Sequence, residues 1–167
     1  QESLNWTTKA SSGTLVVVGI IAIIVQGGLI GPLVKQFGEM RLTLIGSGFI
    51  LVACALLITA PKENATINIY SAVSFLAVGA GLITPTLRAL ISKKLDIDKQ
   101  GSILSNLQGL QSLGGVLGIA MAGRVYDSFG PKSPFIAGSV ILLFMIYLIA
   151  EGKSNNSFNN QKSKVLK

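Results

Sequence analysis

The chain has 167 residues, half of them hydrophobic and only 13% charged, and its mean hydropathy is +0.62. A soluble globular domain is about one quarter charged, so this composition argues against a soluble enzyme and indicates a protein embedded in lipid. The net charge is +7, but the basic residues lie between and after the apolar stretches without interleaved aromatic side chains. This arrangement favours membrane topology over nucleic-acid binding.

Five apolar stretches are long enough to cross a bilayer, since about 20 apolar residues span the roughly 30 Å hydrocarbon core as a helix. They are predicted at residues 13–34, 42–60, 67–91, 102–124 and 134–150. We therefore expect an all-α, polytopic membrane protein with five transmembrane helices between residues 13 and 150. A polar lead-in at 1–12 precedes this bundle, and a disordered, basic cytoplasmic tail is predicted at 151–167.

The basic residues predict the orientation of the bundle. If the C-terminus is cytoplasmic, ten of the 14 Lys and Arg residues fall in or near inner segments and four fall outside. The positive-inside rule therefore favours an outer N-terminus and an inner C-terminus, in a cell or inner membrane. Five spans that begin outside also lead us to expect the rear part of a longer bundle.

The predicted spans carry little that could perform catalysis. They contain no acidic residue, and the chain contains no His, the commonest metal ligand. We find no catalytic dyad, nucleophile with a base, metal cluster or phosphate-binding loop, and so predict neither enzymatic activity nor a cofactor or metal.

Neutral polar residues at membrane depth are the candidate functional groups. Gln108, Gln111 and Ser112 recur at three- and four-residue spacing in the fourth span and therefore share one helix face. Such a stripe either lines a water-filled path or packs against another helix through amide hydrogen bonds, and both interpretations stay open. The same two interpretations apply to Gln26 in the first span.

Arg88 is the charged candidate, three residues after Pro85 in the third span. Its side chain either belongs to the substrate path or extends to the lipid headgroups. The candidate positions for helix packing or gating are residues that loosen a helix or allow close approach. They are Gly31, Gly38, Pro85, Gly114, Gly115 and Gly118.

The stretch QGGLIGPLVKQFGEMRL, Gln26–Leu42, resembles helix eight and the following loop of the major facilitator superfamily, in the drug:proton antiporter branch that includes tetracycline efflux proteins. The family's loop signature is G-x-L-x-D-[RK]-x-G-[RK]. Gly31, Leu33 and Gly38 fit this signature, and Arg41 supplies a basic residue beyond it. The sequence departs from it at three positions, Lys35, Gln36 and Glu39.

Residues 79–127 are similar to helices ten and eleven of the same family, where a Pro and a small-residue turn precede Gln-Gly and a Gly-rich helix. The match uses Pro85, Ser92, Gln100, Gly101, Ser112, Gly118 and Tyr126. It departs where the family often has Gly-Pro, because Gly118 is followed by Ile119.

The resemblance covers about residues 4–150 and implies helices eight to twelve of the C-terminal six-helix bundle. The first, third and fourth spans would line the transport path, while the second and fifth would face lipid. The polarity of the spans independently predicts the same division, because the second and fifth lack strongly polar residues in their middles.

The resemblance also implies a function. We expect a secondary transporter of small organic molecules, an exporter that works by alternating access, with Gln26, Gln108 and Gln111 bonding the substrate. Its expected partners are the bilayer and the missing N-terminal half of the same transporter, or a partner membrane subunit. The alternative is a truncated interaction or scaffold subunit of this fold that does not transport.

Overall fold

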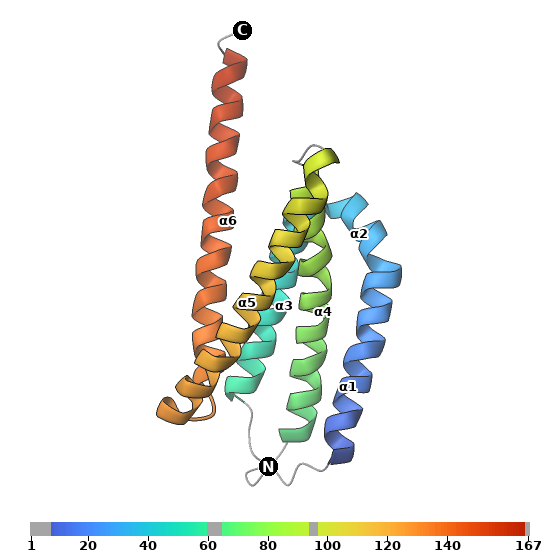
Figure 1. Cartoon of the computed structure of the whole chain (residues 1–167), viewed down its shortest axis with the longest axis vertical. Coiled ribbons are helices and arrows are strands. Elements are labelled where there is room, and N and C mark those ends of the chain that lie inside the picture. Colours follow the sequence, from blue (N-terminus) through green and yellow to red (C-terminus); the bar gives the residue numbers. More distant parts are fainter. Residues whose placement is uncertain (1–7, 60–64, 94–96, 166–167) are drawn as a thin grey trace.

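The computed structural model describes residues 8–59, 65–93 and 97–165. The described residues form helices and short turns and contain no strand, which confirms the all-α prediction (Figure 1). The elements are α1 (Thr8–Ile23), η1 (Ile24–Leu29), α2 (Ile30–Phe37), α3 (Glu39–Thr59), α4 (Ala65–Ser92), α5 (Ile97–Phe129) and α6 (Ser133–Val165). Residues 1–7 of the predicted lead-in, residues 60–64 and 94–96, and residues 166–167 of the predicted tail lie outside the described residues.

The first helix is continuous from α1 to α2 but widens into a π-helical turn at η1. The backbone N–H of Ile30 donates to the carbonyl oxygen of Val25, five residues earlier instead of four. Pro32 has no N–H to offer the carbonyl of Gly28, so the normal α-helical ladder is interrupted at this point. The predicted loosening of this helix therefore takes the form of a π-turn, a feature frequent at functional sites.

The turn between α2 and α3 is a single residue, Gly38, with φ of +76°. Residues that carry a side chain rarely adopt this backbone conformation, so the glycine of the loop signature is required for the sharp reversal of the chain. A second glycine, Gly130, has φ of +88° at the turn between α5 and α6.

α3 and α4 form the tightly packed centre of the fold. A Cβ added to Gly79 would lie 2.6 Å from the carbonyl oxygen of Gly46, so the two backbones meet where both side chains are absent. Phe49 and Phe75 stack across the same interface with ring centroids 5.8 Å apart. α3 therefore buries one face against α4, and the lipid-facing role expected of this span stays a prediction.

α5 crosses the bundle, and α6 runs beside α3 (Figure 1). Where the sequence predicted a disordered tail at 151–167, the structure continues α6 as helix to Val165. The apolar first half of α6 nucleates the helix, and no proline after Pro134 interrupts its extension.

Within the part of the chain that the structure describes, three stretches are long and apolar enough to cross a membrane: Ser12–Phe37, Glu39–Thr59 and Thr66–Ser92. A shorter apolar helix covers Ser133–Ile149. α5 is long enough, but its Gln, Asn, Ser and Gly residues lower its hydropathy. The fourth and fifth spans therefore stay predictions from the sequence.

Candidate functional site

Three of the predicted path residues meet between α4 and α5. The guanidinium Nη2 of Arg88 on α4 donates a hydrogen bond to the side-chain oxygen Oε1 of Gln108 on α5. The same nitrogen lies 3.5 Å from Oε1 of Gln111. The arginine therefore points toward α5, and two amide oxygens converge on its charge.

The helix geometry of α5 explains this convergence. Gln108 and Gln111 are three residues apart, so their side chains leave the helix on neighbouring positions of one face. The hydroxyl of Ser112 donates to the backbone carbonyl of Gln108 within the same helix, 3.0 Å away. Its hydrogen is thus directed at its own helix, and the Arg88 contacts come from the two glutamines.

Among the described residues, the partners of the Arg88 guanidinium are amide oxygens and not a carboxylate. The planar guanidinium group of arginine offers several N–H donors and a positive charge. Both partners that the structure gives it are neutral amides, and all three side chains are exposed. An exposed cation held in this way attracts an anionic or strongly hydrogen-bond-accepting group.

Gln26, the remaining path candidate, lies beside Gly81 of α4. Its side-chain nitrogen Nε2 is 3.9 Å from the place that a Cβ on Gly81 would occupy. Gly81 and Arg88 are two helical turns apart and share a face of α4. Pro85 between them has no N–H to donate to the Gly81 carbonyl, so this carbonyl lacks its usual helical donor.

The glycine candidates divide into two groups. Gly38 forms the tight turn described above, whereas added Cβ atoms on Gly31, Gly114, Gly115 and Gly118 would meet nothing within 4 Å. Close helix contact through glycine occurs instead at Gly46, Gly79 and Gly81. A packing role for the α5 glycines stays a prediction, since the described residues leave that face open.

A buried hydroxyl pair was missed by the sequence reasoning. The hydroxyls of Thr43 on α3 and Thr86 on α4 lie 3.0 Å apart, and both residues are fully buried. Ser47 is also buried and donates to the Thr43 carbonyl. The spacing of Thr43, Gly46 and Ser47, at three and four residues, is the signal that could have revealed this face.

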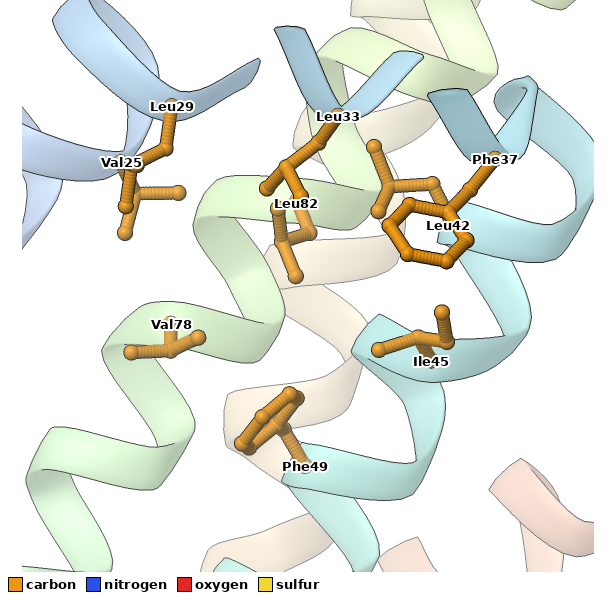
Figure 2. Close-up of a pocket in the computed structure, with 9 residues that line it drawn as sticks. All are labelled: Val25, Leu29, Leu33, Phe37, Leu42, Ile45, Phe49, Val78 and Leu82. Carbon is orange, nitrogen blue, oxygen red and sulfur yellow. The ribbon is translucent and has the colours of Figure 1, made fainter. Parts of the chain in front are cut away.

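A hollow of about 310 Å³ lies among η1, α2, α3 and α4 (Figure 2). Val25, Leu42 and Leu82 are buried in it, whereas Leu29, Phe37 and Ile45 are 40–47% exposed at its edge. All of its lining side chains are apolar. The hollow and the Arg88 cluster are therefore chemically different sites.

The helical fold, the long apolar spans and the polar contacts between helices define a polytopic membrane protein. The sequence profile of the Major Facilitator Superfamily matches residues 1–119. The chain belongs to the Major Facilitator Superfamily and is an integral membrane protein.

Relatives with known names agree with this membership. The chain is 26% identical over 126 residues to tetracycline resistance protein class C of Escherichia coli, which covers 75% of this chain and 31% of that protein. It is 29% identical over 157 residues to tetracycline resistance protein class G of Vibrio anguillarum, covering 89% of this chain and 38% of that protein. It is 23% identical over 129 residues to human hippocampus abundant transcript 1 protein, covering 77% of this chain and 26% of that protein.

The chain thus spans roughly a quarter to two fifths of the length of these relatives. None of the solved structures matches it.

Proposed function

We propose that this chain forms part of the C-terminal half of a secondary transporter that exports small organic molecules, and that Arg88, Gln108 and Gln111 contact the substrate. The observation that carries this proposal is the convergence of two glutamine oxygens on Arg88 across α4 and α5. A polar cluster on an open face of helices of this family is suited to binding, since its groups are available to a ligand.

The proposed mechanism is alternating access, in which two helix bundles rock about a site near the midplane. The α3–α4 pair would move as one unit, because its backbones meet at Gly46 and Gly79. α5 is more open and would change its contacts as the bundles move. The π-turn at η1 and Pro85 in α4 are the interruptions of the helical ladder where such motion can be absorbed.

The charge of the cluster indicates the substrate class. An arginine whose partners in the described part of the chain are neutral amides favours compounds that carry an anionic or acceptor oxygen beside an apolar body. The predicted spans contain no acidic residue, so we place any proton-carrying carboxylate elsewhere in the transporter. The names of the bacterial relatives make tetracycline the first compound to test.

The test replaces both glutamines with leucine, Gln108→Leu with Gln111→Leu, in the full-length gene product, and measures proton-gradient-driven tetracycline flux in vesicles. We expect the tetracycline flux to fall about tenfold or more. Each polar group of the substrate that is left without its hydrogen-bond partner weakens binding by about 1–3 kcal/mol, and 1.4 kcal/mol corresponds to a factor of ten. Gln36→Leu, an exposed glutamine on α2 outside the cluster, is the matched control and keeps wild-type flux. Unchanged flux and substrate preference in the double variant contradict the site assignment.

A second candidate function is a non-transporting interaction or scaffold subunit. The exposed apolar side chains of α5, among them Leu113, Val116 and Ile119, favour it because they offer a large surface to a partner helix. Intact-mass measurement of the native gene product in mild detergent separates the two functions. A mass more than twice the 17.5 kDa of this chain supports the transporter, whereas a mass near 17.5 kDa with one co-purifying partner supports the scaffold.

A further inference from the structure

We propose that the apolar hollow among η1, α2, α3 and α4 binds one acyl chain of an acidic phospholipid whose headgroup lies at Arg41. The hollow lies apart from the Arg88 cluster and does not depend on the function proposed for it.

The lining of the hollow defines the chemistry of its occupant. Small-molecule sites of 300 Å³ or more normally add a few polar groups to an apolar wall, because these groups orient the ligand. This hollow has a volume of about 310 Å³ and only apolar side chains on its walls (Figure 2). It therefore suits a part of a molecule that has no polar atom, such as an alkyl chain.

The form of the hollow fits a lipid that enters from the side. Val25, Leu42 and Leu82 are at most 4% exposed and make a floor, while Leu29, Phe37 and Ile45 stand exposed at the rim. The floor is close-packed at Val25, because a Cβ on Gly81 of α4 would lie only 3.2 Å from the Cγ1 atom of Val25. The site is therefore closed at its floor and accessible from outside the bundle.

The depth of the hollow matches one leaflet. Val25 and Phe37 are 12 residues apart, which corresponds to about 18 Å along a helix. Half of the hydrocarbon core is about 15 Å thick. The hollow thus runs from near the middle of the first span to its end at the α2–α3 turn, the path that an acyl chain takes from bilayer centre to headgroup.

Positive charge lies at the headgroup end. Arg41 is exposed and sits one helical turn before Ile45 on the same face of α3. Side chains on a helix lean toward its N-terminus, so the guanidinium extends from the hollow toward the membrane surface. Lys35 is exposed in the same turn region, and Glu39 of the described turn forms an ion pair with Lys93. The net charge at this end favours an acidic headgroup.

The experiment uses the full-length gene product in vesicles of equal phosphatidylglycerol and phosphatidylcholine. A trace of either lipid carries a photoreactive diazirine in its acyl chain, and labelled peptides are mapped by mass spectrometry after irradiation. We expect labelling of residues 25–49, with phosphatidylglycerol preferred about fivefold, the factor that one basic side chain near an anionic surface contributes.

Three variants test the assignment. Ile45→Trp fills the hollow from its exposed rim and lowers labelling there to the level of the other lipid-facing surfaces. If Ile45→Trp fails to fold, Leu29→Trp fills the hollow from the opposite wall and has the same effect. Val52→Trp, 45% exposed on the same helix but outside the hollow, keeps wild-type labelling. Arg41→Gln keeps the labelling but removes the preference for phosphatidylglycerol.

Two results overturn the proposal. The first is labelling that Ile45→Trp and Leu29→Trp leave unchanged, or a headgroup preference that survives Arg41→Gln. The second is labelling absent from the hollow in the wild type, with crosslinks from a diazirine amino acid at Ile45 to another protein segment, which would mean that a helix covers the hollow.

Discussion

The α3–α4 pair and α5 both contain glycines at close spacing, but they use them differently. On α3 and α4, Gly46 and Gly79 lie where the two backbones touch, and Thr43 and Thr86 share a buried hydrogen bond beside them. On α5, Gly114, Gly115 and Gly118 meet nothing within 4 Å, and the polar groups of this helix are exposed. The first region is closely packed, whereas the second is an open surface that carries the glutamines proposed to bind substrate.

The largest expected effect follows from adding one methyl group to the closely packed region. Gly79→Ala places a Cβ 2.6 Å from the Gly46 carbonyl oxygen and should lower the free energy of unfolding by about 1–3 kcal/mol. Gly115→Ala, the matched change on α5, should be neutral or stabilising by up to about 1 kcal/mol because alanine favours helix. Thermal unfolding of the full-length gene product in detergent measures both. Equal effects of the two variants would remove the distinction between the regions.

The second effect concerns the hydroxyl pair that joins α3 to α4. A double-mutant cycle of Thr43→Val and Thr86→Val should give a coupling of about 0.5–1.5 kcal/mol, the range found for hydrogen bonds between membrane helices. The coupling is modest because each hydroxyl has a single proton, and a carbonyl oxygen of its own helix competes with the other hydroxyl for it. The cycle is read from unfolding in the same detergent. A coupling near zero would show that glycine contact alone holds the pair.

A smaller stability effect is expected at the open region. Arg88→Ala and Gln108→Ala should couple by about 0.5 kcal/mol or less, because the contact joins exposed groups that water can also satisfy. The same pair should nonetheless couple strongly in transport if the cluster binds substrate. Flux and unfolding measured on the same four proteins separate the two contributions. A large coupling in stability with none in flux would make the cluster a structural contact.

The smallest effect is expected at the ion pair of Glu39 and Lys93, which joins the start of α3 to the end of α4. Glu39→Gln should shift the unfolding temperature only slightly, and the shift should shrink at high salt, because the Lys93 side chain is 68% exposed and solvent ions screen its charge. Glu151→Gln, an exposed acidic residue on α6, serves as the control. A shift larger than that of Gly79→Ala would mean that the ion pair, and not the glycine contact, secures the α3–α4 pair.

The sequence by itself determined the helical class, the family and several local features. Long apolar stretches require backbone groups to bond within their own segment, so helices follow from composition. Gly38 and the Pro32 region are also local, since a sharp reversal and an interrupted ladder depend on the residues at those positions. The face shared by Gln108 and Gln111 follows from helical spacing alone.

Tertiary structure decided which faces meet. Nothing in the spacing of the α5 glutamines specifies Arg88 as their partner, because that contact joins residues 20 and 23 positions apart on another helix. Likewise, the number of glycines in the sequence suggested that α5 packs closely against another helix. The closest approach of two helix backbones lies instead at Gly46 on α3 and Gly79 on α4. In a bilayer there is no hydrophobic driving force that favours one apolar helix face over another. Helix pairing therefore depends on how well two helix surfaces fit together, and this fit cannot be read from the sequence of one span.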